Sequence, residues 1–269
     1  MKNLIKNYPT SCRFAFAIIL FGLSLILSGM INKGSIKTYF PFTSTICLTF
    51  VTWIMLKTDN KSLNDIGFDL KLKNIAYLPL GILIGAIAFL IAKYLRAIYL
   101  GESIEMNESI NFKNILYGLY ILLPTVAAEE FLFRGYLFTK TIEKSSVLWA
   151  NILFGILFTL VHVFDSTVIN NPAKILFFSI TIPIGHLLFA TAMLKSKSLY
   201  FPIGIHLGNN WATMHLISSQ TSSDSIFLIS NSVYFNTWPS FILFILLWNG
   251  FYLILIYIIW KWNSITRLF

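Results

Sequence analysis

Charged residues are scarce in this chain. Asp, Glu, Lys and Arg make up 12% of its 269 residues, about half of the ~25% that a soluble domain carries. So few charges cannot cover a water-facing surface, which excludes an ordinary soluble globular protein. Cysteine is scarce too: Cys12 and Cys47 have no CxxC spacing, so we expect no disulfide between them. The sequence also lacks an internal repeat, a low-complexity linker and a soluble domain.

Hydrophobic residues make up 57% of the chain and fall in long runs. Each run is near the ~20 residues that cross a bilayer core as a helix, and each is continuously apolar rather than alternating, which favours helices over a β-barrel. We therefore predict an all-α integral membrane protein, one multi-pass domain over residues 1–269 with a bundle of about eight transmembrane helices. The predicted spans are Phe14–Met30, Phe40–Leu56, Ile75–Ala92, Ile115–Phe138, Val147–Phe164, Ile175–Leu194, Leu199–Ile217 and Phe241–Trp260.

The basic residues predict how the chain is oriented. Lys2, Lys6 and Arg13 precede the first apolar run, as in a secretory signal, but no small-residue cleavage site follows, so we expect a retained helix. Thirteen of the twenty Lys and Arg residues fall on the side that holds both termini, and six on the other. This bias places both termini in the cytoplasm and the protein in the cell membrane. Topology and anionic lipid explain the net charge of +9, so we expect no nucleic-acid partner.

Three ionisable residues lie inside the fourth predicted span: Glu129, Glu130 and Arg134. An ionisable side chain at mid-span costs at least ~2.5–3.5 kcal/mol, so it indicates a functional site. Glu130 and Arg134 are one helical turn apart and can pair, whereas Glu129 points about 100° away from Glu130. The alternative is a buried structural ion network, which is the better account of Glu130 and Arg134 alone.

All four histidines lie in or beside predicted spans, at His162, His186, His206 and His215. Phe158 lies one turn before His162, so its ring can pack beside that imidazole. His206 and Asn210 are also one turn apart and share a helix face. We expect His186 and His215, which have no comparable polar companion, to be structural.

These residues can hydrolyse a peptide bond in two ways. A carboxylate in a low-dielectric cavity can act as a general base toward water, and imidazole and amide groups can stabilise the oxyanion. Alternatively, Glu129, His162 and His206 could hold Zn²⁺. The HExxH spacing is absent, so no cofactor is assigned and zinc is left open. No serine or cysteine lies in a recognisable nucleophile motif.

Three short motifs resemble those of a known family. Glu129-Glu130-x-x-x-Arg134, Phe158-x-x-x-His162 and His206-x-x-x-Asn210 occur in that order in separate apolar segments. They look like the motifs of the CPBP family, the CAAX-protease and bacteriocin-processing intramembrane endopeptidases once grouped with abortive-infection proteins. The resemblance covers about residues 110–220, which would form the catalytic core.

By this resemblance Glu129 is the water-activating base and His162 helps to orient the water. His206 and Asn210 form the oxyanion-stabilising pair, while Glu130, Arg134 and Phe158 support the site. The implied activity is an intramembrane endopeptidase that acts on a membrane-associated or hydrophobic peptide. The family also includes proteins tied to peptide maturation and bacteriocin immunity.

The predicted topology poses a geometric problem. Glu129 and His162 each lie about 15 residues into successive antiparallel spans, up to ~20 Å apart if the helices are straight. We expect a tilt or break, which Pro124 and Gly155 allow, to bring them to one intramembrane cavity. The rival interpretation is a non-catalytic transporter or an immunity protein that binds a toxic peptide. The missing inverted repeat argues against a carrier.

Overall fold

The computed structural model describes residues 9–218 and 224–262. Lys2, Lys6 and Arg267, which entered the prediction of orientation, lie outside these residues, as do both ends of the chain. The longer helices are α2 (Pro9–Ile31), α4 (Thr43–Thr58), α6 (Tyr77–Leu100), α7 (Phe112–Arg134), α8 (Tyr136–Lys144), α9 (Val147–Val163), α10 (Pro172–Ser196), α11 (Tyr200–Trp211) and α12 (Trp238–Trp260). Shorter helical pieces are α3 (Gly34–Tyr39), η1 (Leu63–Ile66), α5 (Leu72–Ile75) and the π-helical turn η2 (Ala212–Leu216).

Five helical segments in the described part of the chain are long and apolar enough to cross a membrane. They are Pro9–Ile31, Leu72–Leu100, Phe112–Lys144, Pro172–Ser196 and Trp238–Trp260. The other three predicted spans are also helical but shorter: α4 has 16 residues, α9 has 17 and α11 has 12. A multi-pass, largely helical membrane protein is therefore confirmed, while crossing by all eight helices stays a prediction.

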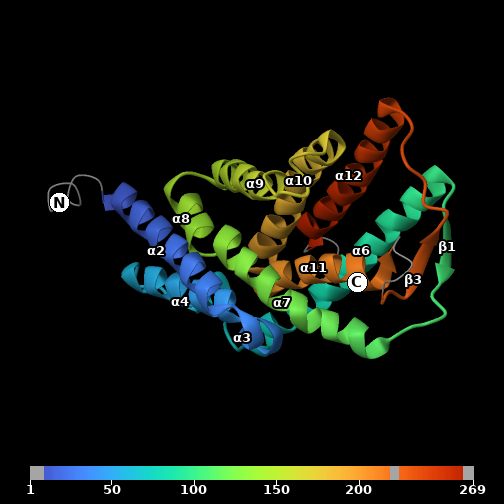
Figure 1. Ribbon diagram of the computed structural model, residues 1–269. Coiled ribbons are helices and arrows are strands. Elements are labelled where there is room, and N and C mark those ends of the chain that lie inside the picture. The colour runs from blue at the N-terminus through green and yellow to red at the C-terminus, as the bar shows by residue number, and fades with distance from the viewer. Residues whose placement is uncertain (1–8, 219–223, 263–269) are drawn as a thin grey trace.

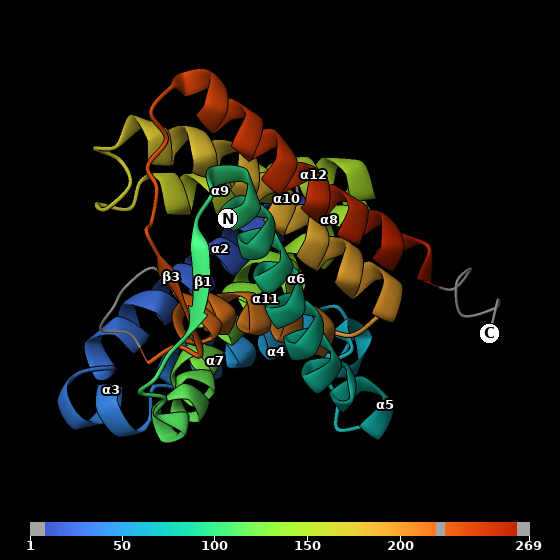
Figure 2. The ribbon, with the colours of Figure 1, turned by 90° about the vertical axis from the view of Figure 1, so that its right-hand side faces the viewer.

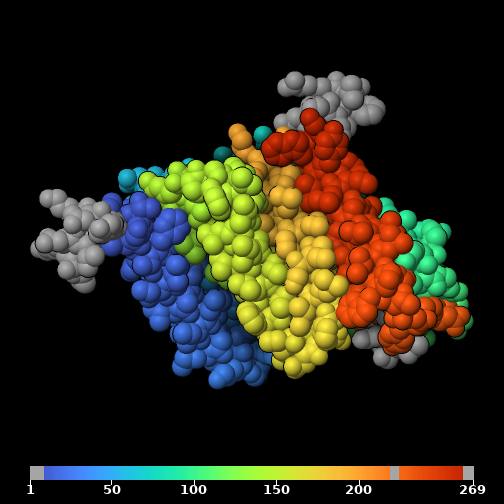
Figure 3. Space-filling view, turned by 90° about the horizontal axis from the view of Figure 1, so that it is seen from above, coloured from blue at the N-terminus to red at the C-terminus, as the bar shows by residue number. Residues whose placement is uncertain are grey.

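Large apolar side chains cover the outside of the bundle. Ile26 of α2 is 64% exposed and Ile254 of α12 is 61% exposed. Water would solvate such an apolar surface poorly, whereas lipid tails would solvate it well. Figure 3 shows α2, α9, α10 and α12 side by side along one such face.

The site is built around α11, which lies in the middle of the molecule (Figures 1 and 2). Helix α6 packs across one side of α11, and α7 and α10 pack on its other sides. Helices α2 and α4 lie beside α7, away from α12. Residues from separate parts of the chain thus surround one short helix.

Glycines allow α6 and α11 to approach closely. A Cβ atom on Gly85 would lie 2.1 Å from the Ile205 carbonyl oxygen, and one on Gly208 would lie 2.1 Å from the Ile82 carbonyl oxygen. A Cβ atom on Gly81 would lie 2.7 Å from the Phe201 carbonyl oxygen, and one on Gly204 would lie 2.4 Å from the Leu78 carbonyl oxygen. Both helices therefore carry a Gly-x-x-x-Gly face of the kind that brings membrane helices together.

The fourth predicted span is broken at Gly135, between α7 and α8. Gly135 has φ −77° and ψ −134°, and a Cβ there would lie 2.2 Å from the Phe131 carbonyl oxygen. Pro124 and Gly155, which would allow a kink, lie inside helices α7 and α9. A break is present at Gly135, between α7 and α8.

A small sheet departs from the all-α prediction. Strands β1 (Ser103–Met106), β3 (Phe227–Ser230) and β2 (Ile217–Ser218) pair in the order β1-β3-β2. Strand β3 is antiparallel to β1 and parallel to β2. Strand β2 begins at the last residue of the seventh predicted span, and β3 lies between that span and α12, where no strand was predicted.

Ion pairs join the segment that follows α4 to helices α2 and α8. Asp59 at the end of α4 pairs with Arg13 of α2 and, at 2.8 Å, with Lys140 of α8, and Lys61 pairs with Glu143. All three lysine and arginine partners come from segments that were predicted to share the cytoplasmic side. Which side of the membrane they face stays a prediction.

Candidate active site

Helix α7 turns its two neighbouring glutamates toward different surroundings. The side chains of Glu130 and Arg134 are fully buried, whereas that of Glu129 is 30% exposed. This follows from the 100° step between consecutive helical residues. Glu129 is thus the carboxylate that a substrate or water molecule can reach.

Glu130 joins Arg134 to His206. Arg134 Nη1 donates to Glu130 Oε1 at 3.2 Å, and His206 Nδ1 lies 2.8 Å from the same oxygen. The Arg134 pair was predicted from spacing, but the bond to His206 was not, because it joins α7 to α11. A carboxylate bonded to one ring nitrogen fixes the orientation of the imidazole and directs the other nitrogen elsewhere.

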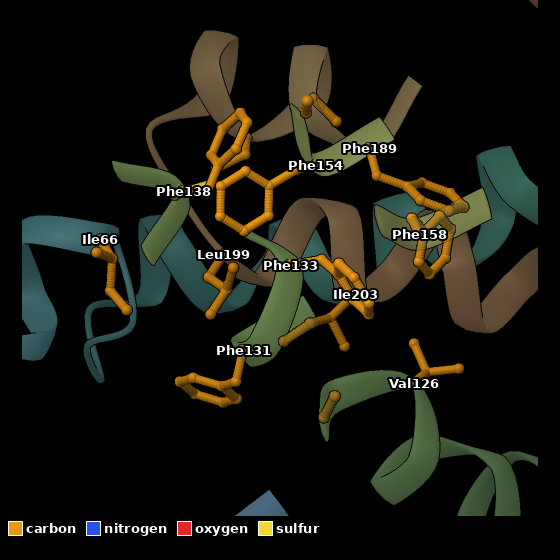
Figure 4. Close-up of a cluster of buried hydrophobic side chains, with 14 of the residues drawn as sticks. Ile66, Val126, Phe131, Phe133, Phe138, Phe154, Phe158, Phe189, Leu199 and Ile203 are labelled. Carbon is orange, nitrogen blue, oxygen red and sulfur yellow. The ribbon is translucent and has the colours of Figure 1, made fainter. Parts of the chain in front are cut away.

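Aromatic rings enclose the charged groups. The Arg134 guanidinium lies 4.5 Å from the centre of the Phe158 ring and 5.1 Å from that of Phe189, and Figure 4 shows these two rings next to each other. His206 stacks on Phe189 with 4.6 Å between ring centres and 16° between planes. Cation–π contacts of this kind stabilise a buried cation. Phe189 was missed because nothing in the sequence separates it from the other 24 phenylalanines.

The second nitrogen of His206 faces Glu129. His206 Nε2 lies 3.8 Å from Glu129 Oε2, which is too long for a hydrogen bond but close enough for electrostatic interaction. Glu129 Oε2 has no hydrogen-bond partner among the described residues. The carboxylate therefore keeps its capacity to accept a proton from another molecule.

His162 is held by its own helix. Its Nδ1 lies 2.8 Å from the Phe158 carbonyl oxygen, and the two rings contact edge to face with 4.5 Å between centres. Because a carbonyl oxygen only accepts, Nδ1 carries the proton, so neutral His162 presents Nε2 as an acceptor.

Glu129 and His162 line the same cavity of about 630 Å³. Its walls come from α2, α7, α9, α10 and the turn after α9, and include Leu25, Leu132 and Asp165. Hydrogen bonds from Thr167 lower the pKa of Asp165 in that turn, so its carboxylate stays charged. The cavity brings together the two residues that uniform straight helices would have kept apart.

A second cavity of about 300 Å³ meets the first at Glu129. Leu25 and Leu132 line both cavities as well, and the second extends between α2, α4 and α7 toward Asn32 and Lys37. Glu129 is thus reached from two directions. Leu25 belongs to α2, outside the motif-bearing segment, and no sequence motif indicated that it would reach the site.

Asn210 lies one turn after His206 on α11 and is half-buried. Within the described residues it makes no hydrogen bond, whereas its neighbour Asn209 donates to the Tyr252 hydroxyl at 2.9 Å. The amide of Asn210 is therefore uncommitted, and its pairing with His206 on an oxyanion stays a prediction.

The other two histidines lie away from both cavities. His186 is 1% exposed and packs against Phe138 and Phe158, with neither nitrogen bonded to a described residue. His215 Nδ1 lies 3.1 Å from the Asp224 carbonyl oxygen. Its ring fills the space above Gly118, where a Cβ would lie 2.2 Å from Nε2. These surroundings agree with structural roles.

The residues named for zinc are not assembled as a ligand set. Over residues 9–218 and 224–262, no three His, Cys, Asp or Glu side chains come close enough to hold a metal ion. Yet the bonds from Nδ1 of His162 and of His206 are of the kind that metal-binding histidines make. The choice between a metal and a metal-free mechanism therefore rests on experiment.

The comparison with family models identifies the core of the chain. Residues 111–212 match the model described as type II CAAX prenyl endopeptidase Rce1-like. This is the family that the three motifs resemble, and the match covers all seven motif residues in less than half of the chain. No curated protein and no solved structure matches significantly. The match indicates a protease and does not favour the transporter or the immunity protein.

Proposed function

Since residues 111–212 match the Rce1-like CAAX prenyl endopeptidases, we propose that this protein is an intramembrane endopeptidase that uses a glutamate-activated water. The observation that carries the proposal is the cavity shared by Glu129 and His162. An acceptor imidazole and an unbonded carboxylate line one space inside a membrane protein.

Water activation follows from the two acceptors. One water molecule can donate one hydrogen to Glu129 and the other to His162 Nε2, which leaves an oxygen lone pair for attack on a peptide carbonyl. Glu129 then takes the proton as the C–O bond forms and can pass it to the leaving amine. His162 orients the water while its Nδ1–H stays on the Phe158 carbonyl oxygen.

The oxyanion would form beside His206. With Nδ1 held on Glu130, a protonated His206 has Nε2–H available to donate to the developing negative charge. Asn210 supplies the second donor from the next turn of α11. Glu130 and Arg134 act by positioning His206, and Phe158 and Phe189 hold Arg134 in place.

The substrate would be a hydrophobic peptide or a membrane-protein segment. Leu25, Leu132 and Phe133 line the cavity around Glu129, and the two cavities on either side of it provide room for the chain before and after the cleaved bond. The match to CAAX prenyl endopeptidases makes a prenylated CAAX peptide the first candidate. The charge bias supports placement in the cell membrane with both termini in the cytoplasm.

The test is cleavage by the purified full-length protein. Prenylated and unprenylated CAAX peptides, together with apolar transmembrane peptides, would be incubated with wild type and with Glu129→Gln. Product masses would identify the cleaved bond, and incorporation of ¹⁸O from labelled water would establish hydrolysis. Specific cleavage by wild type alone supports the proposal. Binding of peptides without cleavage by either protein would overturn it in favour of a peptide-binding protein.

A further inference from the structure

A separate cavity of about 440 Å³ lies between α6, α10 and α12, and three basic residues line it: Lys93, Arg96 and Lys174. Only Lys174 is shared with the catalytic cavity. Neither the proposed mechanism nor the family motifs account for this cavity.

Of the three basic residues that line this cavity, Arg96 alone forms an ion pair with a described carboxylate. Glu102 pairs with Arg96 and accepts a further hydrogen bond from the Val233 backbone N–H at 2.9 Å. Lys93 lies over the Phe89 ring at 5.5 Å and forms no ion pair or hydrogen bond in the described part of the chain. Lys174 donates to the Thr167 carbonyl oxygen and interacts electrostatically with the nearby Asp165 carboxylate without a direct ion pair. Among the described residues, Lys93 and Lys174 thus have no directly paired carboxylate, and both are available to an anionic ligand.

The cavity is polar at one end and apolar at the other. Lys93 and Arg96 belong to the last two turns of α6, and Lys174 to the first turn of α10. Further along the helices, away from these ends, lie Phe177 and Trp248. A second cavity of about 280 Å³, lined mostly by apolar residues of α6 and α12, shares Arg96, Phe244 and Trp248 with the first.

The surface around both cavities is suited to lipid rather than water. Leu95, Ile98 and Leu247 are 46%, 64% and 53% exposed. A basic pocket between membrane helices can bind an anionic lipid headgroup. We propose that this cavity binds an anionic phospholipid, with the phosphate at Lys93 and Lys174 and acyl chains on both sides of Trp248.

The probes are phosphatidylglycerol and phosphatidylcholine with identical acyl chains, titrated into the purified full-length protein and followed by native mass spectrometry. We expect at least tenfold tighter binding of phosphatidylglycerol. Each lysine contributes about fivefold near a membrane surface, so Lys93→Gln/Lys174→Gln should weaken it about thirtyfold. Lys93→Arg, which keeps the charge, should bind as wild type does. Lys113→Gln, an exposed lysine on α7, is the matched control and should also be unaffected.

The position of the bound lipid is tested with phosphatidylglycerol that carries brominated acyl chains, because bromine quenches the fluorescence of nearby tryptophan residues. At one lipid per protein, Trp248→Phe should remove a distinct part of the quenching, and a control Trp53→Phe on α4 should not. Equal binding of the two lipids, equal losses in Lys113→Gln and the double variant, or displacement of the lipid by millimolar inorganic phosphate would each overturn the proposal. Peptide cleavage is not among these readouts, so failure here would be distinct from failure of the protease assignment.

Discussion

Glu130 Oε1 lies 2.8 Å from His206 Nδ1 although the two residues are 76 positions apart. The same oxygen accepts from Arg134, so the position of the histidine depends on a cation one turn further along α7. Arg134 is therefore tied to the active site without touching the cavity. Arg134 is therefore expected to position His206, whereas Glu129 is expected to activate the water.

Arg134→Ala should lower both stability and activity. Removing one partner of a fully buried ion pair costs about 3–5 kcal/mol, and Glu130 would keep its bond to His206 but lose the buried cation that stabilises its charge. Thermal unfolding in detergent and peptide turnover should both fall. A variant of unchanged stability and no activity would instead assign Arg134 a direct catalytic role.

The double variant Glu130→Leu/Arg134→Met is the control for this explanation. Replacing both charges by apolar side chains of similar volume should restore much of the stability. Turnover should stay low, because His206 loses the acceptor that fixes its ring. Recovery of full activity would contradict the positioning role of Glu130.

Glu129→Gln should abolish cleavage and leave the fold intact. The amide keeps the shape of the side chain but cannot take a proton, and general-base catalysis contributes about 10²–10⁴-fold. Because Glu129 is 30% exposed and forms no hydrogen bond to a described residue, the melting temperature should change little. Substantial turnover by this variant would exclude Glu129 as the base.

The sequence predicted local relationships well and contacts between helices poorly. Helix positions follow from apolar runs, and the pair Glu130–Arg134 follows from the pitch of one helix. The bond between Glu130 and His206 depends on how α7 and α11 are rotated and shifted against each other, which no periodicity within one helix determines. The break at Gly135 was not predicted, because the apolar run continues across it to Phe138.

One sequence signal that was overlooked indicates which helix packs against α11. Gly81-x-x-x-Gly85 and Gly204-x-x-x-Gly208 are readable in the sequence, and such pairs favour close helix packing in membranes. They indicate that α6 packs on the helix carrying His206. The short strands gave no such signal, since β2 has two residues and β3 four.

Gly208→Ala should therefore impair the site through the face of α11 that packs against α6. The new Cβ would lie 2.1 Å from the Ile82 carbonyl oxygen, so α11 must move away from α6 and carry His206 with it. We expect a loss of about 1–3 kcal/mol in stability, typical of overpacking, and lower turnover. Gly250→Ala on α12 is the control, because nothing lies within 4 Å of its Cβ. That change should be neutral or should stabilise by up to about 1 kcal/mol.

His162→Gln should reduce turnover more than it reduces peptide binding. A glutamine side chain is not fixed by the Phe158 carbonyl oxygen as the imidazole is, so the water loses one of its two acceptors. We expect kcat to fall by about 10²-fold or more with KM little changed. A rise in KM at constant kcat would place His162 in substrate binding instead.

Metal dependence separates the two hydrolytic mechanisms. If Glu129, His162 and His206 hold Zn²⁺, a chelator should remove activity, zinc should restore it, and metal should co-purify near one ion per chain. If Glu129 acts as the base with His206 and Asn210 on the oxyanion, active protein should contain no stoichiometric metal. We expect the second result, because an amide one turn from His206 suits an oxyanion better than Zn²⁺, which rarely takes an amide ligand. Elemental analysis of active protein and a chelation time course would be measured on the same sample. Stoichiometric zinc whose removal and return track activity would replace the general-base mechanism and leave the protease assignment in place.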